Sequence, residues 1–223
     1  MAFVKKNIEL PFEANGAKAM NRIAIVVSSQ SGHTEKIARS MAGALSGENL
    51  QVDVLNIDQN QLSAFRGYDA AIIGCPVYLG DFSQALIDWT WENREELNSI
   101  PSAFFTVSLN AADARPKARA TDDKALRSFI HQTDFHPRFV ASFAGALNYT
   151  QYSFFKRCVL QGMSAAVGGP TDISQDFDLT NWDEVSRFSQ AFESQDIRSE
   201  FATINRLPVA PQPLWPAGLA RVA

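Results

Sequence analysis

The sequence predicts an α/β fold in which helices cover both faces of a doubly wound, five-stranded parallel sheet. Short apolar runs rich in β-branched residues alternate along the chain with longer segments of helical periodicity. Runs such as 22–27 are apolar at consecutive positions, which is typical of strands buried on both faces. Hydrophobic residues make up 46% of the chain and charged residues 20%, which is ordinary for a protein with a packed core. Alternating strands and helices form right-handed βαβ units and hence a parallel sheet.

Each element of this fold has its own signal along the chain. Strands are expected at 22–27, 51–56, 69–75, 101–109 and 138–146. Helices are expected from about Thr34 to Gly47 and at 82–94, 122–132 and 182–192. Polar and apolar residues alternate in 51–56, which favours an edge position in the sheet. Thr180 or Asn181 is expected to cap the last helix.

The chain divides into one domain with extensions at both ends. Residues 1–21 read as an N-terminal extension, 22–197 as the α/β domain and 198–223 as a proline-rich tail. Residues 149–181 break the alternation and form an insertion before the last helix, and connections of this length are usually functional. The insertion either packs back on the domain or meets a partner through its apolar residues. These residues are Tyr152, Phe154, Phe155, Val159, Leu160 and Met163.

Charge and composition exclude several classes of protein. A net charge of −4 argues against a nucleic-acid-binding protein, which would normally show a basic face. No apolar run approaches the roughly 18 residues that would predict a membrane-spanning helix, and the first residues do not resemble a secretory signal. Cys75 and Cys158 have no metal-binding spacing and are expected to be small apolar residues of a cytoplasmic protein.

The sharpest local motif lies between the first strand and the first helix. Its residues are Ser29, Gln30, Ser31, Gly32, His33 and Thr34. The hydroxyls can donate to phosphate oxygens, Gly32 lets the backbone bend, and the helix that follows adds its positive dipole end. The Walker pattern and the three-glycine dinucleotide fingerprint are both absent, so the motif suits one terminal phosphate. An ordinary turn capped by serine and threonine is the alternative.

Two further loops leave neighbouring strands at the same edge of the predicted sheet. Ligands of doubly wound sheets bind beyond the carboxyl ends of the strands. The second loop contains Pro76, Val77, Tyr78, Leu79 and Gly80, and the third contains Ser108, Leu109 and Asn110. Tyr78 offers a flat ring to stack on a planar ligand, unless it packs on its own helix. Backbone and amide groups of the third loop could face the polar edge of such a ligand.

No side chain stands out as a catalytic acid or base. His33 lies in the phosphate loop, where it is expected to face solvent or the phosphate. His131 and His136 flank the end of a helix among polar residues and are expected at the surface.

Ser29, Ser31, Gly32 and Thr34 match the flavodoxin phosphate-loop pattern Thr/Ser-x-Thr/Ser-Gly-x-Thr position by position, so the chain resembles flavodoxins. The segments IGCPVYLGDFSQAL, SIPSAFFTVSLN, FAGALNY, GGPTD and LTNWDEV further resemble the menaquinone-dependent protoporphyrinogen IX dehydrogenases. This resemblance spans residues 22–194. It implies the strand order 2-1-3-4-5, FMN as cofactor, and electron transfer from protoporphyrinogen IX to a membrane quinone. The insertion carries only Lys156 and Arg157, whereas the family is usually basic there.

The sequence leaves several functions open. A plain flavodoxin-type electron carrier, an NAD(P)H:quinone reductase and a non-enzymatic FMN-binding module compete with the dehydrogenase. Peripheral contact with the inner face of the cell membrane and assembly into a homo-oligomer also stay open.

Overall fold

The computed structural model describes residues 21–45, 50–59, 65–78, 80–113, 115–151, 160–162, 164–165 and 169–195. Its main sheet has five parallel strands in the order β2-β1-β3-β4-β5, which confirms the predicted fold and strand order. The strands are β1 (Arg22–Val27), β2 (Gln51–Asn56), β3 (Ala70–Pro76), β4 (Ser102–Ser108) and β5 (Phe139–Ala144). The half-polar strand β2 lies at an edge, as its alternating pattern predicts.

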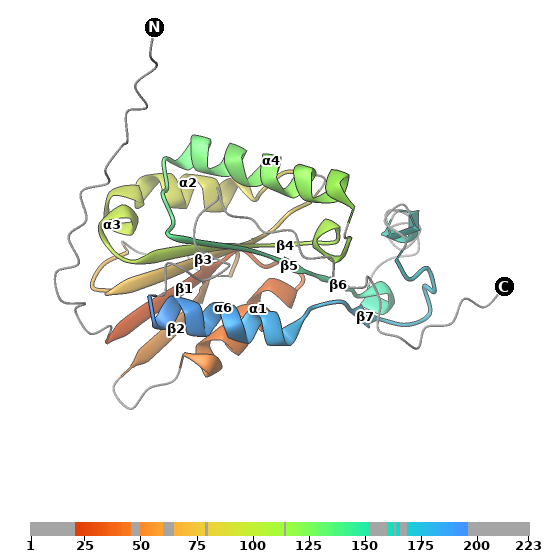
Figure 1. Ribbon diagram of the computed structural model, residues 1–223, viewed down its shortest axis with the longest axis horizontal. Helices are drawn as coiled ribbons and strands as arrows, with labels where there is room; N and C mark the ends of the chain where they lie inside the picture. Colours follow the sequence, from red (N-terminus) through yellow and green to blue (C-terminus); the bar gives the residue numbers. More distant parts are fainter. Residues whose placement is uncertain are drawn as a thin grey trace, which may run out of the picture.

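Helices cover both faces of the sheet, as a doubly wound fold requires (Figure 1). One face carries α1 (His33–Ala44) and α6 (Trp182–Glu193). The other carries α2 (Gln84–Glu92), α3 (Arg94–Ser99) and α4 (Pro116–Thr133). The chain runs outward from β1 to β2, then crosses to β3 on the other side of β1. The winding direction therefore reverses between β1 and β3.

The core consists of two apolar layers separated by the sheet. Ile23 and Ile25 of β1 face the layer that contains residues of α1 and α6, while Ala24 and Val26 face the layer beneath α2 and α4. Close contact between β3 and β4 depends on Gly74, because a Cβ atom there would lie 2.1 Å from the Phe105 ring. A glycine at this strand position thus makes room for an aromatic side chain of the neighbouring strand.

Two helices differ from the sequence prediction. The helix expected at 82–94 is split, because the Asn93 side chain donates to the Trp89 carbonyl (2.8 Å) and ends α2 before α3 begins. The helix expected at 122–132 begins earlier, at Pro116. Proline is favourable in the first turn of a helix, because the backbone N–H that it lacks would have no hydrogen-bond partner within the helix. The first turns of this helix are mostly polar, so their sequence shows no apolar periodicity from which the helix start could be predicted.

The last helix begins where the sequence predicts, and Asn181 rather than Thr180 is its cap. The Asn181 side chain accepts a hydrogen bond from the Glu184 backbone N–H (3.2 Å). The Thr180 hydroxyl instead donates to the Ala144 carbonyl at the end of β5 (2.8 Å).

The insertion is closed at its base by a small antiparallel ladder. It joins β6 (Ala146–Leu147) to β7 (Phe177–Asp178), and the turn η2 (Tyr149–Gln151) follows β6. Asp176 accepts hydrogen bonds from the backbone N–H and the hydroxyl of Thr150, both at 2.8 Å. The chain therefore leaves and re-enters the domain at one place.

Most of the apolar residues predicted for the insertion, Tyr152, Phe154, Phe155, Val159 and Met163, lie outside the described residues, and Leu160 is half-buried.

The described cysteine behaves as an apolar residue, as predicted. Cys75 is fully buried in β3, and burial raises the pKa of its thiol to about 12. Cys158 lies outside the described residues. In the part of the chain that the structure describes, no helix is long and apolar enough to cross a membrane.

Candidate functional site

Three loops emerge side by side at the carboxyl edge of the sheet. Strands β1, β3 and β4 are neighbours, with Val27 beside Gly74 and Pro76 beside Val107. Pairing continues into the loops, because the Ser28 N–H donates to the Gly74 carbonyl (3.1 Å) and the Val77 N–H to the Val107 carbonyl (2.8 Å). The structure thus brings all three predicted loops to the point where the winding reverses, which is where doubly wound sheets bind ligands.

The first loop ends on a glycine in a conformation that other residues avoid. Gly32 has a φ of 81° and is the N-cap of α1, with no side-chain cap of its own. No atom lies within 4 Å of the position that a Cβ would take, so the space beside the helix N-terminus is open. A left-handed glycine therefore exposes the positive end of α1.

Three hydroxyl groups surround this helix N-terminus, and none of them donates a hydrogen bond to another described residue. Thr34 is only 3% exposed and Ser31 is half-buried, yet within the described residues neither hydroxyl makes a hydrogen bond. The Ser29 hydroxyl oxygen accepts from the Glu35 N–H (3.2 Å), which leaves its proton to donate elsewhere. Gln30 is exposed beside them. Unpartnered donors around an open helix N-terminus fit one phosphate group.

His33 does not face solvent, which was one of the two positions expected for it. Its side chain is buried, and Nε2 lies 2.8 Å from the Thr180 hydroxyl and 3.8 Å from an Asp178 oxygen. Because the Thr180 hydroxyl donates to Ala144, it accepts from Nε2–H of His33. Burial lowers the pKa of His33, although Asp178 acts in the opposite direction. The imidazole thus connects the phosphate loop to the chain returning from the insertion. His131 and His136 are exposed, as predicted.

The second loop presents an exposed aromatic ring. Tyr78 and Asp81 exchange two backbone hydrogen bonds of 3.0 and 2.9 Å, and Gly80 turns the chain with a φ of 91°. The Tyr78 side chain is 53% exposed, which favours stacking on a ligand over packing on its own helix. Pro76 and Val77 are half-buried at the base of the loop, and Leu79 lies outside the described residues.

The third loop is held from below by a buried carboxylate that the sequence analysis missed. Asp122 of α4 is 4% exposed and accepts hydrogen bonds from the Ser108 hydroxyl (2.6 Å) and the Asn110 side chain (3.1 Å). Burial raises the pKa of Asp122, while these two hydrogen bonds lower it. The Asn110 amide N–H₂ therefore points inward rather than to the ligand edge, and Leu109 is half-buried between them.

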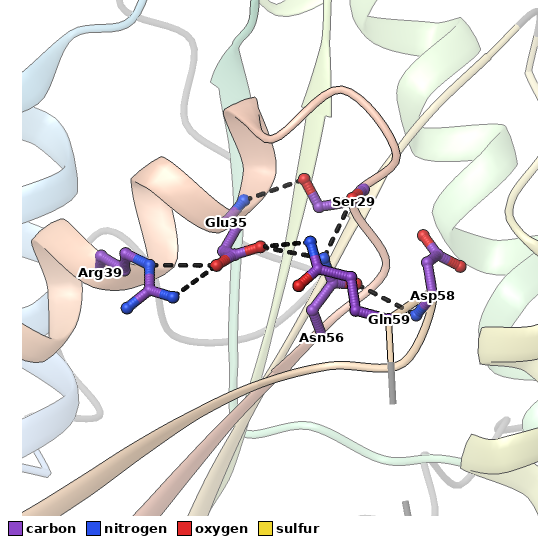
Figure 2. A network of polar contacts seen from close by, with 6 residues as sticks. All are labelled: Ser29, Glu35, Arg39, Asn56, Asp58 and Gln59. Carbon is purple, nitrogen blue, oxygen red and sulfur yellow. Dashed lines mark hydrogen bonds and ion pairs between the residues drawn. The ribbon is translucent and has the colours of Figure 1, made fainter. Parts of the chain in front are cut away.

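A second missed group braces the first loop (Figure 2). Asn56 ends β2, and its side chain donates to the Ser29 carbonyl and to Glu35. Gln59 also donates to Glu35, and the Asp58 N–H donates to the Asn56 side chain. Their position at the carboxyl end of an edge strand could have predicted that they lie near the first loop, because the carboxyl ends of all parallel strands meet at one edge of the sheet.

Known proteins are similar in sequence to this chain over most of its length. A family model described as a flavodoxin domain matches residues 24–174. The protoporphyrinogen IX dehydrogenase [quinone] of Leishmania major is 34% identical over 169 residues, covering 75% of this chain and 73% of the relative. The protein of that name from Escherichia coli (strain K12) is 30% identical over 166 residues, covering 74% and 91%. The crystal structure of Flavodoxin 1 from Bacillus cereus matches 78% of this chain and 97% of its own, with a TM-score of 0.47 and 16% identity.

Proposed function

The chain belongs to the protoporphyrinogen IX dehydrogenase [quinone] family of flavodoxin-domain proteins, and we propose that it uses FMN to oxidise protoporphyrinogen IX with a quinone as acceptor. The family relationship supports an oxidoreductase of this class. The substrate and the acceptor are inferred from the names of the relatives.

The observation that carries the choice of FMN is the set of hydroxyls at the N-terminus of α1 that donate to no other described residue. Ser29, Ser31 and Thr34 would hold the phosphate together with the backbone N–H groups exposed by Gly32. One such site suits a mononucleotide. Tyr78 and the 108–110 loop would flank the ring, and bound FMN would supply the redox chemistry at this edge.

The reaction is a redox exchange that needs no nucleophile from the protein. Six electrons and six protons leave protoporphyrinogen IX, and three quinones reduced to quinols balance them. Quinones of this kind are lipid-soluble, so we propose peripheral contact with the inner face of the cell membrane. The apolar residues of the insertion are the candidates for the substrate or quinone side.

Identification of the bound cofactor is the first test. Mass spectrometry of the ligand released by heating the purified protein should show FMN, and release of FAD would overturn the cofactor assignment. Anaerobic turnover should then proceed with protoporphyrinogen IX and a soluble quinone. Faster quinone reduction by NAD(P)H would favour a reductase, and no turnover with either donor would favour an electron carrier.

Removal of the insertion tests its role in turnover. The structure narrows the deletion to residues 152–174, because β7 and Asp176 close the base of the insertion and Asp178 holds Lys36 of α1 (2.8 Å). The shortened protein should remain folded and yellow and should be reduced normally by dithionite. Protoporphyrinogen turnover should fall sharply. Loss of FMN would instead place the insertion in the cofactor site, and full turnover would exclude it from the reaction.

A further inference from the structure

One buried amide joins the end of β2 to the phosphate loop (Figure 2). Asn56, the last residue of β2, is 4% exposed. Its Nδ2 donates to the Ser29 carbonyl (3.0 Å) and to Oε2 of Glu35 (2.9 Å), and its Oδ1 accepts from the Asp58 N–H (3.1 Å). Both protons of the amide and its oxygen are therefore used. Asparagine can donate two hydrogen bonds and accept one at this position, whereas an ionised aspartate has no proton to donate.

Glu35 completes the brace from the other side. Its carboxylate accepts from Asn56, from Gln59 (3.3 Å) and from two nitrogens of Arg39 (2.6 and 3.1 Å). Its backbone N–H donates to the Ser29 hydroxyl (3.2 Å). Ser29 is thus held at its carbonyl by Asn56 and at its hydroxyl by Glu35. Hydrogen bonds from Arg39 and Asn56 lower the pKa of Glu35.

A general helix effect does not account for this arrangement. An acidic residue in the first turn is favourable beside the helix dipole, and this alone would explain Glu35. It does not explain a buried amide that links that carboxylate to a carbonyl of the preceding loop. A carboxylate near a phosphate site also works against anion binding, so its charge needs the compensation that Arg39 provides.

We propose that Asn56, oriented by Glu35, is a positioning residue that fixes the Ser29 end of the loop and gives the site its preference for FMN over riboflavin. This inference rests on the proposed FMN binding. Because a loop that is already held in its binding geometry loses less entropy on binding, the brace increases affinity for the phosphate. Riboflavin lacks the phosphate and gains nothing from this geometry.

The test compares two flavins on the apoprotein, with dissociation constants from quenching of flavin fluorescence. Asn56→Asp removes both donors and places a second negative charge beside Glu35, and Asn56→Leu removes both donors without adding a charge. FMN affinity should fall roughly tenfold to a hundredfold, while riboflavin affinity should stay the same. Adding Glu35→Gln to Asn56→Asp supplies a donor for the new carboxylate and should recover part of the FMN affinity. An equal loss for both flavins, or no loss for either, would overturn the proposal.

The control is Asp53→Asn on the same strand. Asp53 also joins β2 to β1, through Arg22 (2.8 Å), and it accepts a hydrogen bond from Tyr68 just before β3 (3.1 Å), but it lies toward the amino end of the strand. Both flavins should bind this variant as they bind the unmodified protein. If Asn56→Asp does not fold, Asn56→Ser retains one donor and is held to the same two criteria. If the unmodified protein does not prefer FMN to riboflavin, the cofactor assignment itself fails.

Discussion

The phosphate loop and the loop after β4 are braced in the same way but by groups of different charge. Asn56 holds the first through a neutral amide, and Asp122 holds the second through a carboxyl group. Both braces are 4% exposed and both come from a neighbouring element of the fold. The loop at Tyr78–Asp81 relies instead on backbone hydrogen bonds.

The difference in charge has a consequence for pH. The Asn56 amide does not titrate, but its hydrogen bond lowers the pKa of the Glu35 carboxyl, whereas burial raises the pKa of the Asp122 carboxyl. The raised pKa of Asp122 therefore makes the apoprotein less stable as the pH rises through the range where this carboxyl ionises. The two braces thus respond to pH in opposite directions, because the hydrogen bond from Asn56 favours the ionised form of Glu35 and burial favours the protonated form of Asp122.

The largest loss of FMN affinity is expected from a substitution in the phosphate loop itself. Thr34→Val removes a hydroxyl that has no protein partner in the described structure, so the apoprotein should fold normally. FMN binding should weaken by about 1.5–3 kcal/mol, the usual value for a hydrogen bond to a charged group. Thr133→Val at the far end of α4 is the control and should leave FMN affinity unchanged. Unaltered FMN affinity in Thr34→Val would contradict the phosphate assignment.

Gly32→Val is expected to cause a slightly smaller loss of FMN affinity, together with a loss of stability. The left-handed conformation at this N-cap should cost a residue with a Cβ about 1–2 kcal/mol. Both the free energy of unfolding and FMN affinity should therefore fall, as measured by urea denaturation and fluorescence titration. Gly43→Ala, near the end of the same helix, has open space for a Cβ and should not lower stability or FMN affinity. Equal behaviour of the two variants would show that the conformation at Gly32 does not matter.

Asp122→Asn should separate the two braces by their pH dependence. The unfolded carboxyl titrates near its ordinary pKa of 3.8 and the folded one higher, so the folded state holds more protons between these values. Across that window the unmodified apoprotein should lose stability relative to Asp122→Asn as the pH rises. Urea denaturation at several pH values measures this change. Asn56→Ser is the matched comparison and should respond to pH with the opposite sign. Because it loses a hydrogen bond that lowers the pKa of Glu35, its loss of stability relative to the unmodified protein should shrink as the pH falls.

The smallest effect on stability is expected at Tyr78. Its exposed ring contributes little to the core, so Tyr78→Ala should change the free energy of unfolding by no more than about 0.5 kcal/mol. FMN affinity should fall by about 0.5–1.5 kcal/mol if the ring stacks on the flavin. Tyr78→Phe keeps the ring and should bind FMN normally. A loss of stability without a change in affinity would mean that the ring serves the fold.

The sequence by itself determined the elements of this protein and one of its loops. Consecutive apolar residues predicted the buried strands, alternation placed β2 at an edge, and Asn181 stood among the expected caps. The motif around Gly32 was also found in the sequence, and its role in phosphate binding stays a prediction. These signals succeed because strand burial, helix capping and turn geometry depend on residues a few positions apart.

Only the tertiary structure decided what those elements hold in place. Asn56 reaches Ser29 across 27 positions, Asp122 reaches Ser108 across 14, and His33 meets Thr180 across 147. A buried polar side chain takes whichever partner the register of the sheet and the packing of helices bring within about 3 Å. Local periodicity does not identify that partner. For this reason the contact of His33 with Thr180 was not predicted, and both braces were missed.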